Sequence, residues 1–451
     1  RSTAILIWND IDSGLYRPKP GTVTRTIGAQ YYIDPFINFR SKAGTKHALR
    51  TRLHHQDFEN DNDQSNSNTV MHAEYQAQHT IDLFGETTLT GGLVYRNTES
   101  TALLYAGDAD GDGVNSALNT AGYLQLDKRL FEKISISAGI RYECFAVNDD
   151  EASQPVFRAG ANWQIFKATY LRASYGQGFR FPTIGERFIN TNVGSLRIYP
   201  NNDLRPETSV NIEGGIKQGF KIGGFQGFVD AVVFQQDYTD YVEFTFGRWL
   251  NSTSLDDAFG FGFRSINTGS ARVTGTEFEL AGKGSIGPIE IATLIGYTYT
   301  LPITTTPDYI YGNSSVPGAE QITYNNSSYD PTDKILKFRI QQLFRSDIQF
   351  EYKRIFTGAS VRYNSHVRNL DKIFVDLDDP DSPFPLTTGV GEWMRTHRIG
   401  DTVIDVRLGF ELSEKTKITF IINNLTNLEY AIRPLAIEAP RNMQLQLIVD
   451  L

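Results

Sequence analysis

Apolar and polar residues alternate along most of this chain. In residues 133–145, KISISAGIRYECF, every second position from Ile134 to Tyr142 is apolar, and serine, glycine and charged residues occupy the positions between them. Residues 167–179 and 208–220 repeat this period of two. Because successive side chains of a strand point to opposite faces, the pattern predicts β-strands. The same rule predicts about 17 strands between residue 25 and the end of the chain.

The polar faces of these strands carry full charges. We expect such a face to meet water or protein, while the apolar face meets lipid. The charged residues predicted to face the inside of a barrel are Arg141, Glu143, Arg172, Glu213 and Lys217.

Connections between the predicted strands fall into two classes. Tight turns are predicted near residues 41–46, 82–86, 129–133, 220–225, 282–288 and 412–416. Long polar loops are predicted at about 100–118, 178–206, 244–267, 301–334 and 365–401. Short turns on one side and long loops on the other are typical of outer-membrane barrels, whose long loops are extracellular. We therefore expect the long loops to be extracellular and the tight turns to be periplasmic.

Composition excludes several other classes of protein. A chain of 451 residues suggests several soluble domains, but no linker divides it. A net charge of −9 without a basic stripe argues against a nucleic-acid partner. The single cysteine, Cys144, excludes an internal disulfide framework. No apolar run reaches the roughly 18 residues of a membrane-spanning helix, whereas barrel strands need only about 10 alternating residues.

The order of turns and loops also predicts where the chain begins. With the C-terminus on the side of the tight turns, an odd number of strands places residue 1 on the opposite side. Single-chain bacterial barrels have an even number of strands. We therefore expect residues 1–24 to be an incomplete N-terminal segment, a loop or a remnant strand, and residues 25–451 to form the barrel.

Three motifs, in order, carry a resemblance to a known family. SYGQGFRFPTIGERF (174–188) followed by NNDLRPETS (201–209) resembles the mid-barrel signature of TonB-dependent outer-membrane receptors. TGTEFEL (274–280) resembles a recurrent strand of these barrels, and residues 422–451 resemble their last hairpin. Leu451 departs from the family's preference for a final aromatic residue. The positions that match the family are Phe179, Arg180, Pro182, Leu204, Pro206, Glu207, Asn424, Leu425, Tyr430, Pro440 and Arg441.

The residues of the first motif can be explained by their backbone and side-chain properties. Pro182 cannot donate to a strand ladder and should end the pairing of the strand before it. Phe179 and Phe181 are expected in the outer aromatic girdle, with Arg180 turned toward the lumen or the headgroups. Pro206 restricts Arg205 to an extended conformation as the next strand begins. The simpler alternative is that these residues are barrel architecture without a role in ligand binding.

The resemblance implies an all-β, transmembrane antiparallel β-barrel in the outer membrane of a Gram-negative bacterium. Such receptors capture a scarce small nutrient with their extracellular loops and import it past a plug domain with energy from the TonB complex. The resemblance therefore implies that the long loops bind ligand, through residues that the sequence does not identify. A barrel wide enough for a plug needs about 22 strands, so four or five strands and the plug are expected outside this sequence. Other candidate partners are the lipid bilayer and a surface lipoprotein.

No enzyme motif occurs in the sequence, and no catalytic residue is predicted. Three alternatives to an importer stay open: a porin-like passive channel, a component of a surface assembly, and a barrel lipase or protease, which would need Ser, His and Asp groups converging near a rim. Ferric chelates, cobalamin-like cofactors, peptides and glycans all stay open as ligands.

One loop is a candidate calcium site. DADGDGVNS (108–116) places Asp108, Asp110 and Asp112 at alternate positions before Gly113, like the first half of a calcium-binding loop. Position 12 is Asn119 instead of the usual glutamate, so Asn119 or water would complete the shell around the ion. The alternative is a hydrated acidic loop.

Calcium titration of the purified protein tests this loop. Three carboxylates without the final glutamate predict weak binding, with Kd about 10⁻⁴–10⁻³ M. Calorimetry should detect heat with wild-type protein and none with the Asp110→Ala, Asp112→Ala double variant. Equal heat from both proteins would exclude the site.

Overall fold

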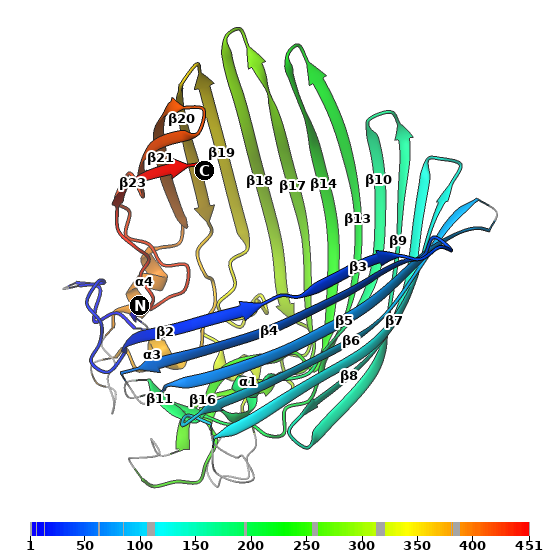
Figure 1. Cartoon of the computed structure of the whole chain (residues 1–451). Helices are drawn as coiled ribbons and strands as arrows, with labels where there is room; N and C mark the ends of the chain where they lie inside the picture. Colours follow the sequence, from blue (N-terminus) through cyan, green and yellow to red (C-terminus); the bar gives the residue numbers. More distant parts are fainter. Residues whose placement is uncertain are drawn as a thin grey trace.

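The protein is built around one antiparallel sheet of 19 strands in the described part of the chain. The computed structural model describes residues 2–5, 7–12, 14–61, 64–83, 85–105, 113–193, 196–254, 260–312, 321–379, 381 and 388–450. Figure 1 shows the sheet curled into an open wall, with β2 to β8 passing in front of the strands behind them.

The strands of this sheet follow one another in chain order. The first half consists of β1 (Ser2–Ile5), β2 (Val23–Ile33), β3 (Phe36–Arg40), β4 (Lys46–Asn60), β5 (Asn66–Asp82), β6 (Glu86–Ala102), β7 (Val114–Leu130), β8 (Ile134–Val147), β9 (Asp150–Phe166) and β10 (Thr169–Arg180). The second half consists of β13 (Glu207–Ile222), β14 (Phe225–Thr239), β17 (Ala271–Ile286), β18 (Ile289–Thr304), β19 (Gln342–Tyr352), β20 (Ile355–Asn364), β21 (Asp401–Ser413), β22 (Thr416–Asn423) and β23 (Asn442–Val449).

Strands β2 and β3 act as one strand. Both pair with β4, and they are separated only at Asp34 and Pro35, where proline has no N–H for the ladder. If the two are counted together and β1 is left aside, 17 strands run from Val23 through the described sheet. The strand count predicted from alternation is therefore confirmed.

The two faces of the sheet have the chemistry that the sequence predicted. Leu124, Ile140 and Phe157 are directly opposed on β7, β8 and β9, and their side chains are 55%, 42% and 46% exposed. Another such row begins at Leu171 on β10 and Ile216 on β13. Exposed apolar rows of this kind are typical of the lipid-facing side of a membrane barrel, so their contact with a bilayer stays a prediction.

The connections sort by length, with two exceptions. The predicted tight turns all join strands at one end of the sheet, here called the turn end; β13 and β14, for example, are joined by Gly223 and Gly224. The predicted long loops lie at the other end. Two connections at that end are also short, residues 61–65 and 148–149, which the sequence analysis did not anticipate.

The two edges of the sheet are not joined within the part of the chain that the structure describes. In the described residues, β1 pairs only with β2, and β23 pairs only with β22. Among the described helices, none is long and apolar enough to cross a membrane.

The long connections fold into a separate layer, here called the cap. It comprises the described residues of 7–22, 181–206, 240–270, 305–341, 365–400 and 424–441. It contains a four-stranded sheet of β11 (Thr191–Val193), β12 (Leu196–Tyr199), β15 (Val242–Arg248) and β16 (Phe261–Asn267). Its short helices are α1 (Ile184–Phe188), α2 (Tyr324–Ser327), α3 (Ile373–Asp376) and α4 (Val390–Thr396).

The assignment of faces can be tested with one substitution at two sites of β8. Ile140→Arg places a cation on the apolar face and should destabilise the folded protein in lipid by about 2–4 kcal/mol. Ser137→Arg, opposite Asp127 on the other face, should cost much less. Urea unfolding in lipid vesicles measures both variants. A larger loss from Ser137→Arg would invert the assignment.

Candidate ligand-recognition cap

The cap is organised around an apolar core that the polar appearance of its loops did not predict. Its buried residues come from five separate stretches of chain: Ile7, Trp8, Leu15, Leu196, Phe263, Leu370, Phe374, Val390, Trp393, Met394 and Leu435. Each loop alone has too few apolar residues to bury, so the core exists only when the loops are packed together. Figure 1 shows α3 and α4 beside the N-terminal segment that contributes Trp8.

Trp8 connects the N-terminal segment to two distant loops. Its indole Nε1 donates to the carbonyl of Thr388 at 2.8 Å, and its backbone N–H donates to the carbonyl of Leu435 at 2.9 Å. Its ring lies 5.1 Å from that of Trp393 in α4. Residues near both ends of the sequence are therefore fixed against each other in the cap.

The four-stranded sheet presents an aromatic face to this core. The Phe263 ring lies 5.3 Å from that of Phe246 on the neighbouring strand and 5.4 Å from that of Phe374 in α3. Ring pairs at these separations stabilise packing beyond the area they bury. The β15–β16 hairpin is thus held against the loop that contains α3.

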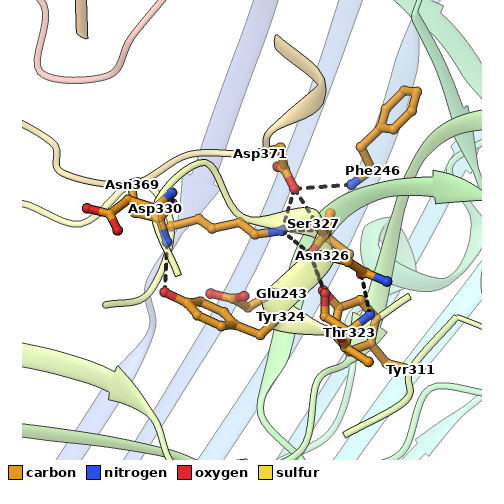
Figure 2. A network of polar contacts seen from close by, with 12 residues as sticks. Glu243, Phe246, Tyr311, Thr323, Tyr324, Asn326, Ser327, Asp330, Asn369 and Asp371 are labelled. Carbon is orange, nitrogen blue, oxygen red and sulfur yellow. Dashed lines mark hydrogen bonds and ion pairs between the residues drawn. The ribbon is translucent and has the colours of Figure 1, made fainter. Parts of the chain in front are cut away.

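A buried ion pair joins three loops on the other side of the same hairpin (Figure 2). Lys337 Nζ lies 2.6 Å from Asp371 Oδ1 and also donates to Thr245 Oγ1 at 2.8 Å and Ser327 Oγ at 2.9 Å. The Lys337 and Asp371 side chains are only 3% and 1% exposed. Three hydrogen bonds satisfy the ammonium group, which makes its burial tolerable.

Glu243, Tyr324 and Asn369 extend this network. Tyr324 Oη donates to the carbonyl of Ile335 at 2.6 Å and accepts from Asn369 Nδ2 at 2.8 Å. Glu243 is buried, and burial raises the pKa of its carboxyl although Lys337 and Arg339 oppose the shift. A raised pKa means that deprotonating Glu243 works against folding, so its contribution to cap stability falls as pH rises through that pKa.

The mid-barrel motif supports the cap at the ends of β10 and β13. Strand pairing ends at Arg180, before Pro182, and β13 starts at Glu207, directly after Pro206, as predicted. Arg180 Nη1 donates to both carboxylate oxygens of Glu186, at 2.8 and 2.9 Å, and its Nη2 lies 3.5 Å from Glu207.

The same motif caps α1. Thr183 Oγ1 accepts from the backbone N–H of Glu186 at 3.2 Å, and the Glu186 carboxylate accepts from the N–H of Thr183 at 2.8 Å. This reciprocal capping box fixes the start of the helix. The motif residues described here make contacts within the protein, which agrees with the alternative that they are part of the barrel architecture.

The expected position of Phe181 is wrong. Its side chain is buried with Val147, Ile184 and Phe188 instead of lying in a lipid-facing girdle. The chain leaves the sheet at Pro182, and α1 then covers the Phe181 ring. Phe179 lies edge-on to Phe145, 5.8 Å away, and its place in a girdle stays a prediction. Leu204 is also buried.

The C-terminal motif closes the last cap loop. Asn424 adopts a positive φ of 51°, and its side chain exchanges two hydrogen bonds of 2.9 Å with the backbone of Leu428. The N–H of Arg441 donates to Asn427 Oδ1 at 3.0 Å, and Arg441 Nη1 reaches the carbonyl of Leu425 at 3.4 Å. Tyr430 is buried and Pro440 exposed.

The residues predicted to face the lumen share the face opposite the apolar rows. Arg172 Nη1 lies 2.7 Å from Asp230, and its Nε lies 3.4 Å from Glu213. Arg141 forms an ion pair with Glu143, and Lys217 Nζ lies 3.5 Å from the centre of the Phe228 ring. What meets this face in the complete protein stays a prediction.

The candidate calcium ligands Asp108, Asp110 and Asp112 lie outside the described residues. Gly113, which follows them, has φ +75°, and a Cβ there would lie 2.5 Å from the carbonyl oxygen of Ala102, so glycine is needed. Asn119 lies within β7, and its side-chain amide donates to Glu143 at 3.0 Å. It is therefore engaged in the wall and is poorly placed to complete a calcium shell.

Sequence reasoning missed Lys337, Asp371 and Glu243. Each is a charged residue within or next to a predicted long polar loop, and nothing in the local pattern distinguishes it from a solvated one. The available signal was the density of aromatic residues in these loops, such as FGFGF at 259–263, which indicates burial.

The buried ion pair predicts a non-additive mutational cycle. Lys337→Met leaves Asp371 buried without its cation and should destabilise the cap by roughly 3–5 kcal/mol. Adding Asp371→Asn removes the unpaired charge and should restore part of that loss. Lys372→Met, which breaks an exposed pair with Asp376, is the matched control and should change little. Thermal unfolding and proteolysis of the cap report the effect; a double variant no more stable than Lys337→Met would contradict it.

Solved receptors share this fold. The siderophore receptor PirA from Acinetobacter baumannii superposes with a TM-score of 0.64 at 12% identity, over 94% of this chain and 62% of that one. A Serratia marcescens hemophore receptor HasR double mutant, solved with its hemophore HasA and heme, gives 0.62 at 13% identity, over 95% and 66%.

Two sequence relatives come from Haemophilus influenzae. A hemoglobin and hemoglobin-haptoglobin-binding protein A is 29% identical over 168 residues, 36% of this chain and 15% of the relative. A heme/hemopexin utilization protein C (strain 86-028NP) is 28% identical over 196 residues, 37% and 26% of the two chains. The chain thus spans less than two thirds of the length of each of these relatives. The family described as TonB dependent receptor-like, beta-barrel matches residues 7–425, so the chain belongs to this family of Gram-negative outer-membrane receptors.

Proposed function

We propose that the complete protein captures a nutrient at the cap and imports it through the barrel with energy from the TonB complex. The observation that carries the proposal is the family match over residues 7–425. Members of this family are transporters and not enzymes. The cap supports the proposal because it is a rigid, aromatic-rich structure at one end of the wall.

The ligand is proposed to be an iron compound such as heme or a ferric chelate. The support comes from the names of the relatives, which include receptors for heme, hemoglobin and siderophores. Within that class, the proposal leaves the individual compound open.

The cap end is proposed to be extracellular and the turn end periplasmic, as long loops and short turns are arranged in such barrels. Unpaired strand edges in a bilayer need hydrogen-bond partners, so we also propose that further strands pair with β1 and β23 and that a plug meets the charged face. In this arrangement β1 is part of a longer wall strand, and residues 7–22 are a cap loop.

A passive, porin-like channel is the second candidate. It explains the barrel but requires neither a packed apolar cap core nor a buried ion pair at its mouth. The two candidates differ in their need for energy, which is the basis of the test.

Growth under iron limitation distinguishes the two functions. A strain that lacks the gene should lose growth on one iron source, such as heme or a ferric siderophore, and regain it on complementation. Deleting the energising complex should abolish that growth to the same extent. Growth and uptake that persist without the complex would favour the passive channel.

A further inference from the structure

Some side chains on the charged face of the wall cross a neighbouring strand to reach a carboxylate on the strand beyond it. Arg407 on β21 donates to the two carboxylate oxygens of Asp347 on β19, at 2.7 and 2.8 Å. Gly358 on β20 lies opposite Arg407 in the ladder, and a Cβ there would lie 2.6 Å from the guanidinium carbon. The arginine can therefore lie across β20 only because the residue beneath it is glycine. Such an arrangement is here called a tie.

A second tie joins β10 to β14. Arg172 lies opposite Gly215 of β13, where a Cβ would lie 3.2 Å from the guanidinium carbon. Beyond that glycine, Arg172 Nη1 lies 2.7 Å from Asp230 on β14. The components are the same as in the first tie: a long side chain, a glycine on the middle strand and a carboxylate on the third.

A third tie joins β7 to β5 through a tyrosine. Tyr123 lies opposite Gly92 of β6, where a Cβ would collide with the phenol ring. Its hydroxyl donates to Glu74 on β5 at 2.8 Å. In all three ties the carboxylate lies two residues before the position that pairs with the glycine, so the ties share one register.

A fourth row has the residues of a tie but is open. Arg345 on β19 lies opposite Gly296 of β18, and Gly296 lies opposite Glu279 of β17. Glu277, two residues before Glu279, takes the position that the carboxylate has in the three ties. A Cβ on Gly296 would meet no heavy atom closer than 4.0 Å, so the Arg345 side chain does not cross this glycine.

The space above Gly296 forms a recess of about 550 Å³, which Arg345, Glu277 and Glu279 also line. All three charged residues are exposed. Within the described residues, their side chains form no ion pair or hydrogen bond. The recess therefore has an unpaired cation on one side and unpaired carboxylates on the other.

The other carboxylates near Arg345 already have partners. Asp347, two residues further along β19, is held by Arg407. Asp405 lies 3.1 Å from Arg362, which is directly opposite Arg345 in the ladder. The carboxylates that Arg345 can reach across its own glycine are thus the free ones of β17.

We propose that Arg345 and Glu277 form a fourth tie, which alternates between the open state of this structure and a closed state in which the guanidinium group crosses Gly296. An exposed single ion pair is weak, whereas Arg407 is held on Asp347 by two parallel hydrogen bonds. The fourth tie is therefore the easier of these two to open. Closure would join β17 to β19 and fill the recess, and opening would widen the passage along this face of the wall.

The reactivity of a thiol in the recess measures the two states. Thr298 lines the recess opposite Glu277. The corresponding residue of the first tie, Ser360, has its Oγ 3.4 Å from Arg407 Nη1, so a closed fourth tie should cover position 298. Purified protein carrying Thr298→Cys, with the single native cysteine removed by Cys144→Ser, is treated with the neutral reagent N-ethylmaleimide, and the reaction rate is measured at low and high salt.

Removing either charge of the tie should expose the thiol. At low salt, Arg345→Gln and Glu277→Gln should each raise the rate about two- to sixfold, the range expected when a weak exposed pair is lost. The two variants change the local charge in opposite senses, so a purely electrostatic effect on the thiol would move their rates in opposite directions. High salt screens the pair and should bring the rate of the intact tie close to those of the variants.

Glu279→Gln is the matched control, because it removes the same charge from the same face two residues away. It should change the rate far less than Glu277→Gln, and the exchanged pair Arg345→Glu, Glu277→Arg should restore slow reaction. Thermal unfolding checks that each variant is folded. Equal rates in the intact tie and both single variants, opposite changes from these two, or an effect of Glu279→Gln as large as that of Glu277→Gln would each overturn the proposal.

The measurement needs neither a ligand nor the energising complex, so its outcome is independent of the proposed import. If the thiol is protected as expected and no iron source requires the gene, the tie stands and the import proposal fails. If import is confirmed and the thiol is equally reactive in all variants, the fourth tie fails alone.

Discussion

Backbone hydrogen bonding is the constraint on which this structure depends. A bilayer offers no water to unpaired N–H and C=O groups, so each strand of the wall must pair with its neighbours along its length. The ladders meet this demand: β5 and β6 pair from Asn66 and Ala102 to Asp82 and Glu86, and β17 and β18 are paired just as continuously. Continuous pairing fixes the register, and the register in turn fixes which side chains face lipid.

Register also explains how charged residues can lie in a membrane wall. Arg141 follows Ile140, yet a step of one residue moves the side chain to the opposite face. The apolar row through Leu124, Ile140 and Phe157 therefore coexists with the Arg141–Glu143 pair one position further along β8. Neither face could change its chemistry without disturbing the other through the shared ladder.

The cap follows a different principle. Its segments leave the wall where pairing ends and regain stability by burying aromatic and aliphatic side chains together. Trp8, Phe374 and Leu435 share one core although they are far apart in the chain. The Lys337–Asp371 pair then fixes the loops relative to one another.

The wall was predictable from the sequence, because alternation and turn residues act over short distances. The period of two at 133–145 indicated both the strand and its lipid face, and the positions of Pro182 and Pro206 indicated where pairing stops and resumes. The packing of the cap could not be predicted in this way, because its contacts appear only in the tertiary structure. Residues from different segments meet in the burial of Phe181, in the Lys337–Asp371 ion pair and in the contact of Trp8 with Leu435. No local sequence pattern indicates which loops will touch. Burial and electrostatic pairing between distant residues require that the ends of the strands are first brought together. These contacts therefore follow from the tertiary structure of the wall and cannot be predicted from the sequence of each loop.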